Sequence, residues 1–427
     1  MTLSSYSRLL RGNRNFRLLW FAQIVSELGD WFYSVAIIGF LLELTGSARM
    51  VALVFLFQML PQTLIAPAAG VINDRLSRKH VMIAADLGRG VIVLSMLLVR
   101  SRETLWILFV LLFFETVCWG FFEPGRSAVI PNIVLAEDVP GANALSSTTW
   151  SVNFALGAAL GGFAVVSLGR EAVFVLNSLS FLVSAWLIWR MRFFEPHAEN
   201  QAPLRARDLF NFSDIAEGIR YVTRDRRMTA TVCVKGGIGL MGANLVLLPV
   251  LGERVFPLRL GNATLQQAQT LGMSVLFGAR GIGALLGAFA AAGFAKSDPT
   301  RLRSTILAGF LLIGAGYVAL GSTVASLAAA VLALMVAHGG ASACWVASTT
   351  LLLQQTEDRF RGRVFSAENA LLTLTVAATN ITAGHLMDLG IAPRAVAVAT
   401  GLVILVPAGL WFVSNRSDSS RTPSSQS

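Results

Sequence analysis

Twelve long apolar segments constrain this chain more than any other feature of its sequence. A helix needs about 20 consecutive apolar residues to cross a bilayer. A segment that crosses lipid must also form its backbone hydrogen bonds internally. We therefore predict an all-α membrane protein with twelve transmembrane helices. The segments cover residues 18–42, 51–71, 81–99, 105–122, 148–166, 173–189, 230–251, 271–295, 305–320, 325–347, 367–387 and 396–412.

The composition excludes a soluble globular protein. Of the 427 residues, 55% are hydrophobic and only 14% are charged, and the mean hydropathy is +0.65. Soluble domains carry about 25% charged residues. The chain is long enough for a large multi-pass membrane protein.

A polar gap separates the first six apolar segments from the last six. It is rich in charge, and residues 209–222 place apolar side chains among polar ones, which predicts an amphipathic interfacial helix. The Ser-rich end of the chain is too polar to form a core. The predicted domains are a six-helix bundle over 1–189, a cytoplasmic linker over 190–228, a second six-helix bundle over 229–414 and a disordered tail over 415–427.

The net charge of +10 follows from membrane topology. Most of the 34 Lys and Arg residues fall on segments that share one side of the membrane with the N-terminus. Cytoplasmic loops carry such an excess, so we expect both termini in the cytoplasm. We expect a multi-pass protein of the cell inner (plasma) membrane that binds the lipid bilayer and no nucleic acid.

The first span carries polar side chains along one face. Gln23, Glu27 and Asp30 recur at helical spacing. Asp30 lies about 18 Å from the start of the segment, near mid-bilayer. Each buried acid costs about 2.5–3.5 kcal/mol on insertion scales. Either hydrogen bonds or basic partners neutralise these acids, or they handle protons or substrate.

Acidic residues also lie in the third and fourth spans. Asp86 and Arg89 are spaced i, i+3 and can pair on one helix face, which predicts a structural ion pair. Glu115 lies deep in the fourth span with Trp119 one turn later on the same face. Glu115 is either a cavity residue or a structurally satisfied acid.

The second half of the chain carries basic groups within its spans. Lys235 in span seven and Arg280 in span eight are costly unless they are paired or face water. They could neutralise the acids of the first half across a cavity, or bind an anionic cargo. His338 in span ten is either a hydrogen-bonded packing residue or a proton relay.

The sequence contains no pattern typical of an enzyme. There is no H-E-x-x-H, Walker loop or Ser/His/Asp grouping. The three cysteines lie on different predicted helices and form neither a disulfide framework nor a metal site. A channel would need repeated rings of like side chains, and none is apparent. We expect no enzymatic activity, no bound cofactor and no metal.

A short loop joins the second and third spans and reads G-V-I-N-D-R-L-S-R-K over residues 70–79. We expect Gly70 to let the two helices approach closely and Asp74 to cap the helix that follows. A cationic group marks this side as cytoplasmic. The group consists of Arg75, Arg78 and Lys79.

This loop resembles the signature loop between spans two and three of the major facilitator superfamily, with Ser77 where that family usually has Gly. The resemblance implies two six-helix bundles around a cavity, alternating access, and a cytoplasmic latch whose core is Asp74 and Arg75. Further motifs resemble the branch that includes macrolide-efflux proteins and the enterobactin exporter. They are N-R-N-F-R-L-L-W (13–20), S-E-L-G-D-W (26–31), F-E-P-G-R-S-A-V-I-P (122–131) and R-G-R-V-F-S (361–366).

The resemblance implies proton-driven export by alternating access, with the proton gradient as the energy source. We expect the cargo to be a small drug-like or siderophore-like molecule and the working unit to be a monomer. Many drug/proton antiporters have an Arg in the fourth span, where this chain has Glu115 before Gly120. We therefore assign proton coupling to Glu27 and Asp30. A lipid-moving protein and a non-transporting membrane sensor remain as alternatives.

Overall fold

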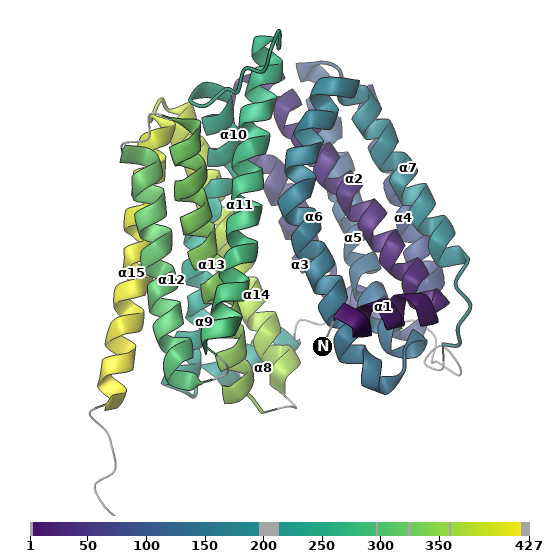
Figure 1. Ribbon diagram of the computed structural model, residues 1–427, viewed down its shortest axis with the longest axis vertical. Helices are drawn as coiled ribbons and strands as arrows, with labels where there is room; N and C mark the ends of the chain where they lie inside the picture. Colours follow the sequence, from purple (N-terminus) through teal and green to yellow (C-terminus); the bar gives the residue numbers. More distant parts are fainter. Residues whose placement is uncertain (1–2, 196–212, 296–297, 323–325, 358–359, 420–427) are drawn as a thin grey trace, which may run out of the picture. The chain divides into compact units, whose positions relative to one another are not determined.

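The computed structural model describes residues 3–195, 213–295, 298–322, 326–357 and 360–419, and within these ranges the regular structure is helical (Figure 1). The N-terminal helices are α1 (Leu3–Gly12), α2 (Arg14–Thr45), α3 (Ala48–Arg75), α4 (Arg78–Ser95), α5 (Leu105–Ile133), α6 (Val139–Leu168) and α7 (Arg170–Trp189). The later helices are α8 (Ser213–Val222), α9 (Arg226–Gly239), α10 (Asn244–Arg254), α11 (Leu265–Ala295), α12 (Pro299–Ser322), α13 (Leu327–Gln355), α14 (Arg361–Asp388) and α15 (Pro393–Ser419). Short 3₁₀ turns join several of them, at Met96–Leu98, Arg102–Thr104, Ala136–Asp138 and Leu240–Ala243.

Twelve helical stretches of the described chain are long and apolar enough to cross a membrane. The helices α2 to α7 form six of them. Helices α9 and α10, separated only by the 3₁₀ turn Leu240–Ala243 (η6), form the seventh, and α11 to α15 complete the set. The predicted all-α fold with twelve spans is confirmed.

The chain divides into two compact units. Unit 1 contains Met1–Gly46 and Leu53–Asn211, and unit 2 contains Ser47–Ala52 and Phe212–Ser427. Within unit 1, α2 packs against α6 and α7, and α4 packs against α5 and α7. Within unit 2, α13 packs against α11 and α12, and α14 packs against α8 and α9.

The first turn of α3 groups with unit 2 because Asp388 of α14 caps it. The Asp388 carboxylate accepts hydrogen bonds from Ser47 Oγ at 2.5 Å and from the backbone N of Ala48 at 2.7 Å. Two turns earlier on α14, Asn380 Nδ2 donates to the carbonyl of Ala52 at 2.9 Å. A side chain far away in the sequence thus satisfies donors that a helix N-terminus leaves without partners.

Helix ends follow local sequence. The Asn13 side chain accepts from the backbone N of Phe16 at 2.9 Å and caps the start of α2. Gly46, with a φ of 63°, directly follows the last residue of α2 and caps its end. Positive φ favours glycine. Ser77 caps α4 by accepting from the backbone N of His80. The prediction that Asp74 caps this helix is therefore wrong, because Asp74 lies inside the last turn of α3.

Helix α8 forms within the segment predicted to be an amphipathic interfacial helix, and one of its sides packs on protein. Glu217 pairs with Arg363 of α14 at 3.0 Å, and the Tyr221 and Phe360 rings stack at 4.1 Å. Val222 is buried in the same cluster. Residues 196–212 of the predicted linker lie outside the described residues.

The C-terminal end of the chain differs from the prediction in one respect. Helix α15 continues to Ser419, so the first residues of the predicted disordered tail are helical. Residues 420–427 lie outside the described part of the chain.

Candidate functional site

Arg89 of α4 lies at the centre of a group of three acids in unit 1, of which Asp86 and Glu115 are buried and Asp30 is partly exposed. Its Nη2 is 2.7 Å from Asp30 Oδ2 of α2, and its Nε is 2.8 Å from Glu115 Oε1 of α5. Its Nη1 is 3.7 Å from Asp86 Oδ1, one turn earlier on α4. The Arg89 side chain is only 2% exposed, and its guanidinium lies 4.0 Å from the centre of the Phe181 ring of α7. We call Arg89, Asp30, Asp86 and Glu115 the Arg89 cluster.

The cluster contains three carboxyl groups and one guanidinium. With every acid ionised it would hold an excess of negative charge away from water, and uncompensated buried charge is strongly unfavourable. Asp86 is fully buried, and neither of its carboxyl oxygens has a hydrogen-bond partner of normal geometry within the described chain. The cluster is therefore more than a simple ion pair, because three carboxyl groups surround one guanidinium.

The structure differs from the sequence analysis in the main partners of Arg89 and in the base that neutralises Asp30. Arg89 and Asp86 do approach each other, but the shorter contacts of Arg89 go to Asp30 and Glu115. The base that neutralises Asp30 is thus a neighbour in the same unit. Sequence spacing showed the i, i+3 pair and could not show which residues of other helices meet it.

Glu27 lies in a separate polar group one turn before Asp30. Its two carboxylate oxygens accept from Gln23 Nε2 and Asn153 Nδ2, each at 2.8 Å. Gln23 Oε1 in turn accepts from Arg126 Nη1 at 3.2 Å. Neutral amides therefore hold Glu27, whereas a guanidinium holds Asp30.

Trp119 is half-buried on α5, one turn after Glu115. Glu123, one turn further, pairs with Arg126, with Arg126 Nε 2.9 Å from Glu123 Oε2. The charged side chains along this helix therefore have partners within unit 1.

The signature loop is held by backbone carbonyls of unit 1. Arg78 donates to the carbonyls of Asn73 at 3.1 Å and Ala128 at 2.9 Å, and Lys79 Nζ donates to the carbonyl of Met191 at 2.7 Å. The highly exposed Asp74 lies 3.6 Å from Arg78. These contacts anchor the loop to α5 and to the end of α7.

Gly70 does not mark a close helix contact. Apart from the neighbouring backbone of α3 itself, no described atom lies within 4 Å of the position that a Cβ would take there. The expectation that Gly70 lets two helices approach closely is wrong. Arg75 is the last residue of α3, and α4 begins at Arg78, so residues 70–75 of the signature loop are helical.

Unit 2 contains its own buried ion pair. Lys235 Nζ of α9 lies 3.0 Å from Glu368 Oε2 of α14 and 3.9 Å from the centre of the Trp345 ring of α13. Sequence analysis identified Lys235 and missed Glu368. An acid directly after the start of a predicted span, two residues past the R-G-R-V-F-S motif, was the available signal.

His338 lies on α13 and Arg280 lies on α11, both in unit 2. His338 Nε2 is 3.0 Å from the Tyr317 hydroxyl, and both side chains are buried. The Arg280 guanidinium lies 5.9 Å from the centre of the Phe277 ring. The hydrogen bond provides the packing role that the sequence left as one of two alternatives for His338.

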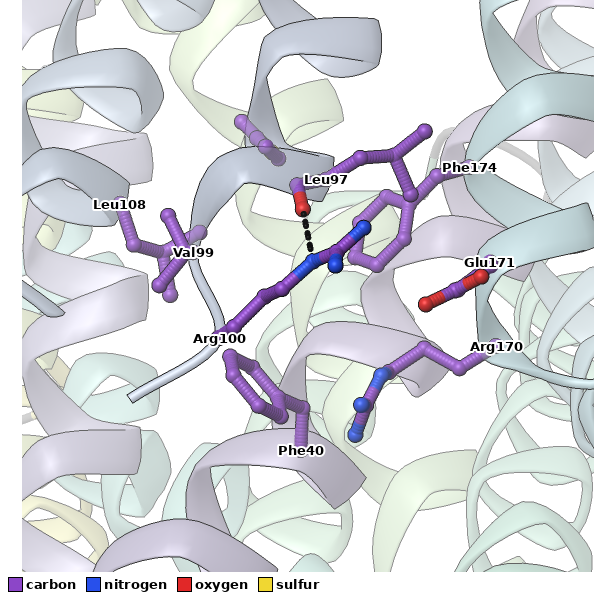
Figure 2. Close-up of a pocket in the computed structure, with 9 residues that line it drawn as sticks. Phe40, Leu97, Val99, Arg100, Leu108, Arg170, Glu171 and Phe174 are labelled. Carbon is purple, nitrogen blue, oxygen red and sulfur yellow. Dashed lines mark hydrogen bonds between the residues drawn. The ribbon is translucent and has the colours of Figure 1, made fainter. Parts of the chain in front are cut away.

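A small pocket in unit 1 lies away from these groups (Figure 2). The side chains of Phe40, Arg170 and Phe174 contribute to its lining, and Arg100 Nε donates to the carbonyl of Leu97 at 3.4 Å beside it. The space inside is about 20 Å³, and one water needs about 10–15 Å³. It is too small to hold an organic cargo.

Solved structures share this fold. A crystal structure of a POT family transporter in complex with a thioalcohol-conjugated peptide superimposes with a TM-score of 0.74 at 12% identity, over 95% of this chain and 96% of that chain. Together with the twelve spans, this defines a multi-pass membrane transporter fold. Over residues 4–425 the chain matches the major facilitator family described as transmembrane secretion effector, and it belongs to that family.

Curated relatives are similar over part of their length. Macrolide efflux protein A of Streptococcus pyogenes is 27% identical over 172 residues, 40% of this chain and 42% of that protein. The putative bacilysin exporter BacE of Bacillus subtilis is 32% identical over 126 residues, 30% of this chain and 32% of that protein. The matched segments thus span less than half the length of these relatives. The resemblance to the efflux branch is confirmed, and the proteins named in this family and among these relatives are transporters rather than enzymes.

Proposed function

We propose that this transporter exports a small organic molecule across the bacterial inner membrane by proton antiport with alternating access. Relatives named for macrolide efflux and for bacilysin export support export as the direction of transport and a small molecule as the cargo. The positive-inside charge distribution supports cytoplasmic termini. We propose a monomer as the working unit.

The Arg89 cluster is the observation that carries the proposal. Asp30 and Glu115 share one guanidinium, and Asp86 lies within 3.7 Å of it without a hydrogen bond. A proton that binds one of these carboxyls removes its attraction for Arg89, and Arg89 then pairs more closely with the remaining acids. Because the acids belong to α2, α4 and α5, each change of partner alters which helices are held together.

Glu27 is the second proton-handling group in this proposal. Its ties to Gln23 and Asn153 are neutral hydrogen bonds, so a protonated Glu27 leaves no buried base without a partner. The remaining cavity candidates are Trp119, Lys235, Arg280 and His338. The signature loop, with Gly70, Asp74, Arg75, Arg78 and Lys79, is the proposed conformational latch.

The experiment uses inside-out vesicles with an imposed pH gradient, reported by quenching of an acridine dye. Macrolides, lipophilic cations and catecholate siderophores are added one at a time. Dequenching that requires the protein identifies a cargo and establishes proton antiport. No response to any compound, with binding still visible as a thermal shift, would contradict antiport of these cargo classes and favour a sensor. Movement of headgroup-labelled lipid instead would favour a lipid-moving protein.

Matched variants test whether Glu27 and Asp30 handle the protons. Glu27→Gln with Asp30→Asn should abolish cargo-dependent dequenching, because both proton-handling acids of α2 are then neutral. Glu103→Gln is the control, since Glu103 is exposed on the turn before α5. Wild-type dequenching in the double variant would overturn the assignment of Glu27 and Asp30.

A further inference from the structure

The buried ion pair of unit 2 resembles a cation-binding site that is already filled. Lys235 Nζ contacts a carboxylate on one side, at 3.0 Å from Glu368 Oε2, and an indole face on the other, at 3.9 Å from the centre of the Trp345 ring. A carboxylate and an aromatic face are the two groups that recognise organic ammonium ions in proteins. Two of the three side chains here therefore select for positive charge.

The carboxylate of Glu368 has unused capacity. Its Oε2 accepts from Lys235, while its Oε1 is buried and has no hydrogen-bond partner within the described residues. A buried acceptor left without a donor is unfavourable. The free acceptor favours a ligand that brings an N–H donor or a positive charge over one that brings an anion.

Trp345 provides a route to the site. Lys235 and Glu368 are 4% and 2% exposed, whereas Trp345 is 43% exposed. Stacking or cation–π contact with the indole can therefore precede contact with the carboxylate. The exposed indole ring also provides a surface on which the apolar part of a ligand can pack.

The helix that carries Lys235 is interrupted close to the site. Helix α9 ends at Gly239, one turn after Lys235, and the 3₁₀ turn Leu240–Ala243 separates it from α10. Thr379 Oγ1 of α14 donates to the carbonyl of Gly239, the last residue of α9, at 3.0 Å. Interrupted spans of this kind mark binding sites in secondary transporters.

We infer that Glu368 and Trp345 form a binding site for an organic cation, a protonated amine or a quaternary ammonium or phosphonium group, and that Lys235 occupies this site as a tethered competitor. A ligand cation gains the carboxylate and the indole face only when the Lys235 ammonium leaves them. This assigns a charge class to the cargo and therefore rests on the proposed export function.

The opposite assignment has a distinct consequence. If Lys235 were the recognition group, the ligand would be an anion and Glu368 would be the competitor. Neutralising Lys235 would then abolish binding, and neutralising Glu368 would strengthen it. The two assignments thus predict opposite effects for the same pair of variants.

The test is equilibrium binding of radiolabelled tetraphenylphosphonium to the purified full-length protein, without a proton gradient. When Lys235 occupies the site, only the fraction of protein with a free site can bind the ligand, and the apparent affinity falls in proportion to that fraction. Lys235→Met removes the competitor, so this variant should bind the cation at least about tenfold more tightly than the wild type. Lys235→Arg keeps a competing cation and should match the wild type. In the Lys235→Met background, Glu368→Gln and Trp345→Ala should each remove the gain. Lys235→Gln is a second neutral variant with the same expectation, for use if Lys235→Met does not elute as a single species.

The inference is overturned if folded Lys235→Met or Lys235→Gln binds tetraphenylphosphonium no more tightly than the wild type. Salicylate, measured in parallel, should bind weakly to every variant; strong binding that is lost in Lys235→Met would establish the anion site instead. Because the assay has no pH gradient, failure of proton antiport leaves its result unaffected. If Lys235 proves not to compete with the ligand, the result of the vesicle experiment on Glu27 and Asp30 is likewise unaffected.

Discussion

Asp30 Oδ2 of α2 lies 2.7 Å from Arg89 Nη2 of α4, so an acid predicted to handle protons is held by a base of its own unit. The same guanidinium is 2.8 Å from Glu115 of α5. One arginine of the first unit is therefore shared by three acids.

Loss of Arg89 should strongly destabilise the protein. Arg89→Met leaves the buried carboxyls of Asp86 and Glu115 and the partly exposed carboxyl of Asp30 without this cation. Removing one partner of a buried ion pair costs about 3–5 kcal/mol. The measurement is the free energy of unfolding in mixed micelles. The control is Arg170→Met, because Arg170 forms a partly exposed pair with Glu43 at 3.2 Å that should contribute about 1 kcal/mol or less. Equal effects of the two substitutions would contradict the central role of Arg89.

Asp30 should be energetically coupled to Glu115 and independent of Glu27. Asp30 and Glu115 share Arg89, whereas Glu27 has its own partners, Gln23 and Asn153. In double-mutant cycles, Asp30→Asn with Glu115→Gln should show a coupling of about 1 kcal/mol or more, and Asp30→Asn with Glu27→Gln about 0.5 kcal/mol or less. The reverse order of the two coupling energies would favour the adjacent-acid pair expected from spacing alone.

A larger side chain at Gly287 should disrupt unit 2. A Cβ at this position of α11 would overlap the backbone of Gly339 on α13. Gly287→Val should lower the free energy of unfolding by about 1–3 kcal/mol, the usual cost of overpacking. Gly293 lies further along the same helix with no described atom within 4 Å of a Cβ, so Gly293→Val is the matched control and should have the smaller effect. Similar losses at both sites would refute the close α11–α13 contact.

The Asp388 cap should protect the first turn of α3. Asp388→Ala removes the acceptor for Ser47 Oγ and Ala48 N, and loss of a helix cap costs about 0.5–2 kcal/mol. Amide hydrogen exchange of residues 48–52 should therefore accelerate by about tenfold, equivalent to about 1.4 kcal/mol. Asp388→Asn retains an acceptor and should accelerate exchange less. Unchanged exchange in Asp388→Ala would show that other contacts hold this turn.

Much of the fold could be predicted because lipid imposes strong and local rules. Apolar length alone located the twelve spans, and the signature loop and motifs identified the superfamily. Helix ends were less accurate, since capping depends on exact geometry. Ser77, one residue before α4, serves as the cap that Asp74 was expected to provide.

The site was only partly predictable because its contacts join distant parts of the sequence. Periodicity identified Asp30 and Glu115 as costly acids, but it could not show that Arg89 lies between them. Glu368 was missed because it lies at the start of an apolar span, where an acid can also face the membrane surface. Its ion-pair partner is Lys235, which is far away in the sequence. The two side chains meet only because α9 packs on α14.

The most direct test of the account measures cargo-driven proton movement in a protein whose Arg89 cluster has lost its two close acids. With a cargo identified in the vesicle assay, Asp30→Asn with Glu115→Gln is compared with the wild type and with Glu103→Gln. The account predicts that the double variant still binds cargo but gives no cargo-dependent dequenching, while Glu103→Gln matches the wild type. Dequenching at the wild-type rate in the double variant would contradict proton coupling through the Arg89 cluster.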